Sequence, residues 1–490
     1  MSTSVIVHRM NVCDIPTHNP NAWRDDLTKR FRDGHRILTL FGRRDHDRVL
    51  ITAVLQAQDR SIVLSRSTVT PEFGYHELTS EFPALHCFER ELHEQTGVRI
   101  AAHAWLKPIR YEGKTQSAMN EYPFYKIEGK EVHEVAVGPV HAGVIEPGSF
   151  RFMCLGEQVH HLEIQLGYQH RGVERRLLER EPTRLTPLVE TIAGDTSIAH
   201  AWAYCSTLES VSDCELDIEV EAARAIALEL ERVAMHLAGL SGLAADVGFL
   251  QGATTYGRLR TTAINTTMRL CGSRFGRGAL RPGGVAMRLP PDLLNEVRGN
   301  LNLLRRDLPI INECFLASQT VQHRLRSVGV LTEAQAAELG LVGMAARASG
   351  IPIDARQEVK SGAYKVLPIP VAIIRDGDCW GRARLRIAEM DASLLWLSTI
   401  LALYPNWDCP RKRIGSLAPN QIAFALVEGW RGEVIHCLET GATGEVVHYK
   451  VQDPSFRNWM GLAIAVRGNE ISDFPICNKS FDLSYCGNDL

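Results

Sequence analysis

Hydrophobic and polar positions follow two different periods along the chain. Three early stretches alternate apolar and polar residues and are bounded by turn formers: 35–44, 48–58 and 61–68. Such alternation is typical of strands. The segments 21–34 and 83–98 instead have helical spacing, and the second ends at Gly97, a common helix terminator. We therefore predict one sheet with two helices in the first ~125 residues.

A polar, turn-rich segment, 110–135, is expected to link this part to a second one. Short alternating runs broken by Gly and Pro then predict a few antiparallel strands, and after Gly172 the pattern turns helical. The helical stretches are 216–240, 292–306, 333–347 and 382–403, and a final alternating stretch, 432–456, predicts a hairpin. The predicted fold is α+β, with an α+β domain at 1–125 and a mostly helical domain with small antiparallel sheets at 126–490.

The stretch from Glu190 to Cys205, "ETIAGDTSIAHAWAYC", does not fit a simple helix. The polar residues Gly-Asp-Thr-Ser interrupt small and apolar sequence that runs on into another helical pattern. Polar turns usually lie on a surface, so a polar elbow in apolar surroundings marks this stretch as a candidate site.

Composition narrows the class of protein. Apolar residues make up 45% and charged residues 23% of the 490 positions, and the net charge is −3. These values are typical of an ordinary globular protein and give no indication of nucleic acid as a partner. The N-terminus lacks the features of a signal peptide, and the longest apolar runs, 394–404 and 366–374, are too short to span a bilayer. We therefore expect no transmembrane segment, and no disulfide framework, because disulfides are typical of exported proteins. The chain has 12 cysteines, and no two of them have Cys-x-x-Cys spacing.

Several charged residues stand in apolar or helical context. Asp246 lies in "LSGLAADVGFL", where an unpaired carboxylate would be costly, and Arg171 and Glu174 are three residues apart on an expected first helical turn. His236 follows Arg232 by four residues on one helix face. Two interpretations stay open: these residues form structural ion pairs, or they belong to a functional site.

The order of motifs resembles a known family. "LGYQHRGVE", "ELERVAMHLAGL", "CGSRFGRGALRPGGV", "GDCWGRARLRIAEM" and the tail "DFPICNKSFDLSYCGNDL" resemble the large subunit of hydrogenase-4 and formate hydrogenlyase type [NiFe] hydrogenases and the related 49-kDa subunit of respiratory complex I. "FERELHEQTGV" resembles the 30-kDa-type subunit that is often fused ahead of it. The resemblance covers nearly the whole chain.

The resemblance places two metal-ligand positions of the hydrogenases in the elbow. Hydrogenases of the family carry two cysteines there and two more near the C-terminus, which hold nickel and iron. In this chain, the four positions are occupied by Ala193, Thr196, Ser484 and Gly487. Ala and Gly offer no ligand, and neutral hydroxyls replace soft thiolates poorly. The resemblance therefore implies a degenerate site that binds no metal, and we expect no NiFe centre.

The resemblance to complex I raises a quinone as an alternative. Its quinone pocket opens with Gly-Pro-x-His-x-x-x-His-Gly; "GPVHAGVIEPG" keeps His141, but the second histidine falls on Ile145 or Glu146. Asp246 matches the aspartate that partners the missing histidine. The frame of the pocket is retained without two headgroup contacts, so quinone binding stays open.

Other roles come from the resemblance alone. Arg171 matches an arginine beside the [4Fe–4S] cluster of the neighbouring small subunit, where a cation favours the reduced cluster. Glu174 matches the glutamate that passes protons from the metal site. The matched motifs also include His236 and Arg281, and the polar set around the elbow includes Asp195 and His200.

Two hypotheses follow. The first is a subunit of a membrane-associated, complex I-like or hydrogenase-4-like oxidoreductase that takes electrons from the [4Fe–4S] cluster of a complex I-type small subunit. It would hold no cofactor of its own unless a quinone binds, and it would couple electron arrival to proton or quinone chemistry through Glu174 and Asp246. Antiporter-like membrane subunits would be its neighbours on the cytoplasmic side of the membrane. The alternative is a non-catalytic scaffold subunit, because a retained fold does not establish activity.

Overall fold

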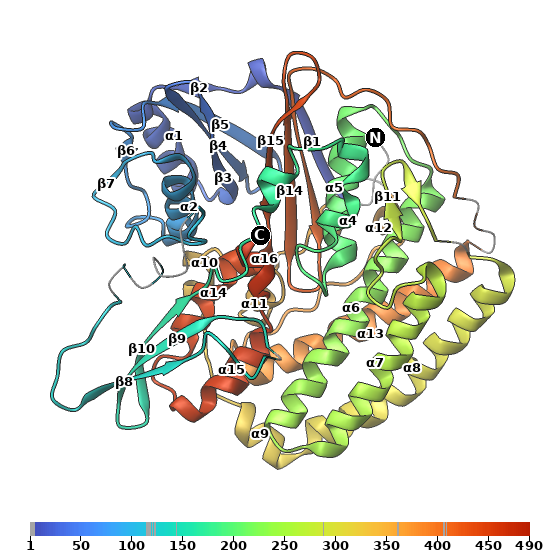
Figure 1. The fold of residues 1–490 in the computed structure, drawn as a ribbon. Coiled ribbons are helices and arrows are strands. Elements are labelled where there is room, and N and C mark those ends of the chain that lie inside the picture. The colour runs from blue at the N-terminus through green and yellow to red at the C-terminus, as the bar shows by residue number, and fades with distance from the viewer. Residues whose placement is uncertain are drawn as a thin grey trace.

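The computed structural model describes residues 5–490 except 114–118, 120, 122–123, 144, 288, 360–361, 405–406 and 408. It is an α+β fold, as predicted. Figure 1 shows its three regions: an N-terminal α+β unit, a central sheet built largely from the C-terminal strands, and a group of long helices beside that sheet.

The N-terminal unit has one four-stranded sheet in the order β2-β5-β4-β3. Its strands are β2 (Thr17–His18), β3 (Arg36–Asp45), β4 (Arg48–Gln56) and β5 (Ile62–Val69). The three longer strands are antiparallel neighbours and confirm the predicted alternation. Helices α1 (Pro20–Arg32) and α2 (His86–Thr96) confirm the two predicted helices. Gly97 ends α2 with φ +72°, a left-handed conformation that glycine adopts without steric cost.

A second four-stranded sheet is antiparallel throughout, with the order β1-β13-β14-β15. Its strands are β1 (Ile6–Asn11), β13 (Gln421–Glu428), β14 (Glu433–Thr440) and β15 (Val446–Gln452). The last two confirm the predicted hairpin. The first strand of the chain was not predicted as part of this sheet; Ile6 pairs with Leu426, across almost the full length of the chain.

The two sheets pack against each other. One apolar cluster joins Leu38, Phe41 and Val54 of the N-terminal sheet to Phe424 and Ile435 of the second sheet. Helices cover the other face of the N-terminal sheet, so its central strands are buried on both sides. The domain boundary near residue 125 stays a prediction, since part of the chain around it lies outside the described residues.

A third sheet, with the order β10-β9-β8, confirms the antiparallel strands predicted after the linker. Its strands are β8 (Val132–Val137), β9 (Ser149–Leu155) and β10 (Gln158–Gln165). β8 begins at Val132, inside the segment predicted as linker, and the sheet projects at the lower left of Figure 1.

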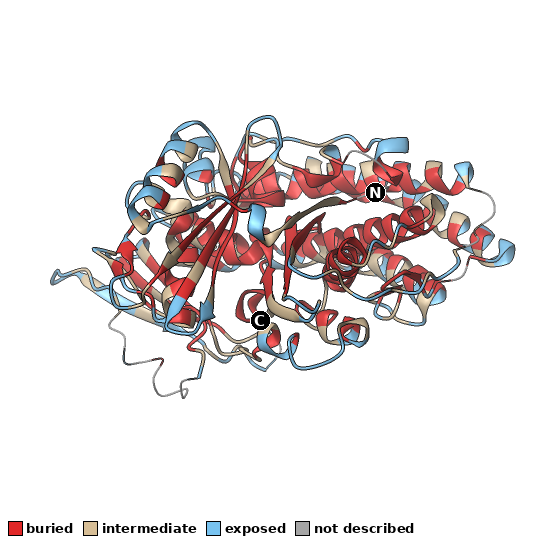
Figure 2. Cartoon of the chain, turned by 90° about the horizontal axis from the view of Figure 1, so that it is seen from above, coloured by how far each residue is buried: buried red, intermediate tan, exposed pale blue. Residues whose placement is uncertain are grey.

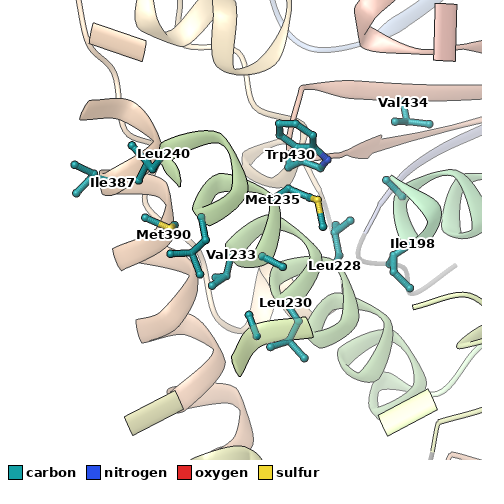
Figure 3. Packing of buried hydrophobic residues seen from close by; sticks show 14 of the residues in the cluster. Ile198, Leu228, Leu230, Val233, Met235, Leu240, Ile387, Met390, Trp430 and Val434 are labelled. Carbon is teal, nitrogen blue, oxygen red and sulfur yellow. The ribbon is translucent and has the colours of Figure 1, made fainter. Parts of the chain in front are cut away.

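Long helices build the main core. They are α6 (Ile218–Asp246), α7 (Leu250–Cys271), α8 (Pro291–Ala317) and α13 (Cys379–Leu403). Figure 2 shows buried residues along much of their length. Figure 3 shows the labelled α6 side chains between α13, which carries Ile387 and Met390, and α5 (Ser197–Val211), which carries Ile198.

Three of the predicted helical stretches are confirmed, and one is divided. The predicted helix at 333–347 is two short helices, α10 (Glu333–Glu338) and α11 (Gly343–Ala348). The break occurs because Gly340, between the two helices, and Gly343, the first residue of α11, both have positive φ. α7 was not predicted; its many threonines and two glycines weaken the helical pattern.

The remaining elements are short. The other helices are α3 (Val173–Arg176), α4 (Thr186–Val189), α9 (Gln319–Leu325), α12 (Ala363–Val366), α14 (Pro454–Ala465), α15 (Phe474–Phe481) and α16 (Tyr485–Asp489). The other strands are β6 (Tyr75–His76), β7 (Ile100–Ala101), β11 (Leu280–Arg281) and β12 (Gly284–Val285), and 3₁₀ turns cover Val12–Asp14, Pro83–Leu85, Pro182–Arg184, Ala355–Gln357 and Ile471–Asp473.

Candidate functional site at the elbow and the C-terminal tail

The elbow, residues 190–196, joins α4 to α5 inside the protein. The Ser197 hydroxyl donates to the backbone carbonyls of Glu190, at 3.1 Å, and Gly194, at 3.3 Å. The Glu190 carboxylate accepts the backbone N–H of Gly278 at 2.7 Å. A buried turn must satisfy its backbone polar groups in this way, so the polar residues of the elbow are a requirement of its position and not a sign of a surface loop.

Arg431 lies at the centre of the site. It comes from the turn between β13 and β14, and its guanidinium donates to both carboxylate oxygens of Asp195, at 2.6 and 2.7 Å. It also donates to the Thr196 hydroxyl at 3.1 Å and to the backbone carbonyl of Asp482 at 2.5 Å. Such a two-point arginine–carboxylate pair is both strong and directional. Arg431 therefore connects the elbow to the C-terminal tail.

The C-terminal tail forms the opposite wall. Ser484 caps α16: its hydroxyl accepts the Gly487 N–H at 2.9 Å, while its own N–H donates to the Ser455 hydroxyl at 2.9 Å. A Cβ placed on Gly487 would lie 2.6 Å from the Asp453 carboxylate, so only glycine fits there. The tail positions named by the resemblance are thus in a close-packed, hydrogen-bonded turn.

Arg171 forms hydrogen bonds to both the elbow and the tail. Its guanidinium donates to the elbow carbonyls of Thr191, at 2.6 Å, and Ile192, at 3.0 Å, and to the tail carbonyl of Cys486 at 3.2 Å. The structure thus brings together the elbow and the tail, which are far apart in the sequence.

The residues at the four ligand positions do not fit a NiFe centre. Ala193 has no donor atom, and the Gly487 position faces the Asp453 carboxylate. The hydroxyls of Thr196 and Ser484 are engaged with Arg431 and with the α16 N-terminus. A full guanidinium charge beside Thr196 would also repel metal cations. Cys477 instead neighbours Cys379 of α13 (the two thiols are hydrogen-bonded), while Cys486 lies against the Ser484 hydroxyl.

His200 belongs to a fully buried polar chain beside this site. One ring nitrogen lies 3.1 Å from Asp453 and the other 3.1 Å from His436, whose second nitrogen is 2.8 Å from the Tyr449 hydroxyl. Burial and the neighbouring His200 lower the pKa of His436 well below its usual value. Burial is the largest influence on Asp453 and opposes its ionisation, but His200, the charge of Arg431 and the Ser455 N–H together outweigh burial, so the pKa of Asp453 is lowered. The chain links the elbow helix α5 to β14, β15 and the start of α14.

Glu174 lies behind the elbow in an ionic cluster. Its carboxylate accepts from Lys450 at 2.9 Å, from the Val451 N–H at 2.9 Å and from the Gln95 amide at 3.0 Å. Burial would raise the pKa of Glu174, but the charges of Lys450 and Arg110 outweigh burial and lower it to about 2. Glu174 is therefore ionised at neutral pH, and the role in proton passage implied by the resemblance stays a prediction.

Asp246 is less buried than its sequence context suggested. It lies exposed at the C-terminal end of α6, so the expectation of apolar surroundings is wrong. Partial burial raises its pKa against the opposing charge of Lys479, which itself donates to Asp482 at 2.9 Å. Asp246 thus lies at the outer end of α6, near Lys479 and Asp482, which come just before Ser484 in the sequence.

The other predicted residues lie around the site in separate contacts. His236 is buried and 2.8 Å from Glu389, and burial lowers its pKa to about 4. His141 lies 2.8 Å from the Gly148 carbonyl, in the loop before β9. Arg281 is 3.5 Å from Glu190 and partly exposed. Of these three, only Arg281 touches the elbow directly.

Sequence reasoning missed Arg431 and a buried ionic network next to it. Arg347 is fully buried and pairs with Glu389 at 2.8 Å and Glu428 at 2.6 Å. Arg356 pairs with Glu229 at 3.1 Å and Asp354 at 2.7 Å. Glu229 and Arg232 stand three residues apart inside an otherwise apolar helix, and this spacing was a usable signal for the network. Arg431 follows the buried Trp430 in a tight turn and gave no such signal.

Comparison with known proteins places the chain in a family. A family model for the 49-kDa subunit of respiratory-chain NADH dehydrogenase matches residues 246–414. The carbon monoxide-induced hydrogenase of Rhodospirillum rubrum is 31% identical over 351 residues, which cover 71% of this chain and 97% of that protein. The chain belongs to this family of hydrogenases and 49-kDa respiratory subunits. The resemblance to hydrogenase large subunits and to the 49-kDa subunit of complex I is thereby confirmed.

Other members of the family show its range. Hydrogenase-4 component G of Escherichia coli (strain K12) is 29% identical, and the match covers 78% of this chain and 65% of that protein. A solved structure of the membrane-bound sulfane sulfur reductase, an archaeal respiratory membrane complex, shares the fold with a TM-score of 0.69 at 22% identity, over 75% of this chain and all of that chain. The relatives support a complex I-like oxidoreductase subunit, and one of them, from Pyrococcus furiosus, is named as the alpha subunit of a membrane-bound hydrogenase. In the described part of this chain, no helix is long and apolar enough to cross a membrane.

Proposed function

We propose that this chain is the large subunit of a membrane-associated oxidoreductase complex and takes electrons from a [4Fe–4S] cluster of a small partner subunit at the surface around Arg171. Antiporter-like membrane subunits would be further partners, on the cytoplasmic side of the membrane. The elbow and tail would face the electron acceptor, a quinone or another group, without a NiFe centre.

The position of Arg171 is the observation that carries this proposal. Arg171 lines an open, basic groove of about 510 Å³ together with His170, Arg175 and Arg176. Its guanidinium is bonded to the elbow and the tail on the inner side of the groove. A cation in this position favours an electron-rich cluster outside, and its bonds tie the groove rigidly to the inner site.

The inner site can respond to a change of charge. Arg431 is held between Asp195 and the tail, and the chain from Asp453 through His200 ends at the buried Tyr449. An electron arriving nearby raises the affinity of neighbouring groups for protons. We propose that Asp195 and His200 respond in this way, together with Asp246 at the outer end of α6, and that Glu174 is a fixed negative charge.

Electron flow in the assembled complex tests the proposal. Arg171→Gln removes the cation from the surface that faces the cluster, and it is expected to slow electron flow about tenfold, which corresponds to about 1.4 kcal/mol of activation free energy. Arg375→Gln is the control, because Arg375 has 74% of its side chain exposed, does not line this groove and pairs with the exposed Glu333, at 2.9 Å. The control is expected to leave the rate unchanged.

The opposite result supports the alternative function. If both variants assemble and electron flow is unchanged in Arg171→Gln, the chain is a non-catalytic scaffold that has kept the fold and the interfaces. Stoichiometric nickel in the purified complex would contradict the absence of a NiFe centre.

A further inference from the structure

The buried glutamate Glu231 lies next to the elbow, at the first turn of α5. It is on α6, is 6% exposed, and accepts the backbone N–H of Ile198 at 2.8 Å. Ile198 is in the first turn of α5, so Glu231 takes the place of a helix cap. The residue at the cap position, Thr196, makes no capping bond because its hydroxyl is engaged with Asp195 and Arg431. Glu231 therefore has a local structural reason to be near the elbow.

Capping explains only one of the two carboxyl oxygens. Oε2 receives the N–H of Ile198, whereas Oε1 is buried and has no hydrogen-bond partner among the described residues. The neighbouring Arg232 does not supply one, because its guanidinium is bonded to the backbone carbonyls of Glu428 and Gly429. A buried carboxylate with a free oxygen and no ion pair is costly, while a neutral carboxylic acid is not.

Glu231 shares a small cavity with the elbow. The cavity has a volume of about 10 Å³, and its polar lining residues are Glu231, Asp195, Thr267 and Arg274. A space of roughly this size holds one water molecule if several polar groups surround it. Arg274 is exposed at the surface, so the cavity lies between the buried acid and the outside of the protein.

We propose that Glu231 holds an exchangeable proton at the elbow and passes it to Asp195 through one water molecule bound in this shared cavity. In the transfer, the O–H bond of the Glu231 acid breaks, the water gives one of its protons to an Asp195 oxygen, and the water keeps the proton from Glu231. The reverse steps reload Glu231 from solvent by way of Asp195. This deepens the proposed function, on which it rests, by naming the proton-holding group of the site.

The surrounding groups are consistent with a neutral acid. The charged groups and N–H donors that act on Glu231 are Asp195 on the elbow, Arg232 on α6, Arg274 after α7, and the N–H groups of Ile198 and Ala199 on α5. Burial is the largest influence, and together with the Asp195 charge it outweighs the N–H donors and Arg232 and raises the pKa of Glu231 to about 8. Glu174, by contrast, cannot hold a proton near neutral pH, because its pKa is about 2.

The substitution Glu231→Gln separates a cap from a proton holder. The amide oxygen of glutamine still accepts the N–H of Ile198, but glutamine carries no titrating proton. In infrared spectra of the full chain, subtraction of Glu231→Gln from the wild type is expected to leave a protonated carboxylic acid band that disappears as the pH rises through about 8. Bands from Glu89 and Glu428, whose pKa values burial raises to about 7, are present in both proteins and cancel. Glu179→Gln, at an exposed position, is the control and keeps the band.

Thermal unfolding gives a second measurement. The folded state must keep Glu231 protonated, or ionise it while buried, whereas the unfolded chain ionises near its ordinary value of 4.5. The wild type therefore loses stability relative to Glu231→Gln as the pH rises from about 5 to 8, by roughly 1 °C in Tm per pH unit. An identical pH dependence in both proteins, or no titrating band in the difference spectrum, overturns the proposal.

The functional measurement is made on the assembled complex. Glu231→Gln is expected to slow electron flow about tenfold or more and to remove a break in its pH profile near pH 8. Unchanged flow and an unchanged profile overturn the transfer to Asp195. The infrared band needs no electron flow, so failure of the proposed function (no effect of Arg171→Gln) is distinguishable from failure of this inference.

Discussion

Removing the charge of Glu174 should destabilise the protein in a pH-dependent way. The ordinary pKa of this carboxyl is 4.5, and the charges of Lys450 and Arg110, working against burial, lower it to about 2 in the folded protein. A difference of about 2.5 in pKa corresponds to about 3 kcal/mol of stability. The folded pKa is the lower one, so this stability is present in full above about pH 4.5 and is lost as the pH falls towards 2.

The size of the effect on melting follows from chain length. The entropy of unfolding is roughly 2.1 cal/mol/K per residue, which gives about 1 kcal/mol/K for a chain of this length. Glu174→Gln should therefore lower the Tm by about 3 °C near neutral pH. Near pH 3 the wild-type charge contributes only about 1.4 kcal/mol, so the difference in Tm should shrink to about 1 °C.

Differential scanning fluorimetry at one fixed scan rate measures both values. Glu179→Gln is the matched control, because Glu179 has 57% of its side chain exposed and its pair with Arg175 is weak; its Tm should change by less than about 0.5 °C. An equal drop in Tm at both pH values for Glu174→Gln would mean that lost packing, and not lost charge, is responsible. No drop near neutral pH would refute the ionised Glu174–Lys450 pair.

Two further predictions concern the interior next to the site. Arg347→Met leaves two buried carboxylates without their cation and should cost about 3–5 kcal/mol, seen as a Tm drop of about 3–5 °C. Its control is Arg375→Met, at a position with 74% side-chain exposure, which should change Tm by less than about 1 °C. Equal effects of the two variants would contradict the buried network. Gly343→Ala should lower Tm and soluble yield, because its Cβ would lie 2.1 Å from the Arg431 carbonyl at φ +62°. Its control is Gly299→Ala, in the open interior of α8, which should stabilise by up to about 1 kcal/mol. A stabilising Gly343→Ala would show that the turn at Arg431 is not close-packed.

Much of the fold could be predicted because its signals are local. The strands β3, β4 and β5 and the hairpin β14–β15 follow from alternation, and α6 and α13 follow from helical spacing. α7 escaped prediction because threonine and glycine dilute the apolar stripe, and β1 because its pairing partner lies more than 400 residues away. A six-residue strand has no local feature that names its neighbour.

Some residues of the candidate site could be predicted from local signals, and others could not. The elbow was recognisable from polar residues in an apolar run, and the order of motifs pointed to the family and to the tail. Arg431 could not be predicted, because a single arginine after a tryptophan in a turn has no distinctive sequence pattern. Its role depends on the folded position of the turn between Asp195 and Asp482. Glu174 and Asp246 were found as residues, but their charge states depend on Lys450 and on exposure, which are properties of the folded chain.

The sequence by itself determined the fold class and the family, because periodicity, motif order and side-chain chemistry are local or additive along the chain. Only the tertiary structure decided what the elbow and the tail contact: an arginine paired with Asp195, a glycine facing Asp453, and a buried glutamate beside the first turn of α5. The reason is physical. Hydrogen bonds and pKa values depend on distances of a few ångströms and on exclusion of water, and both arise when elements remote in sequence pack together.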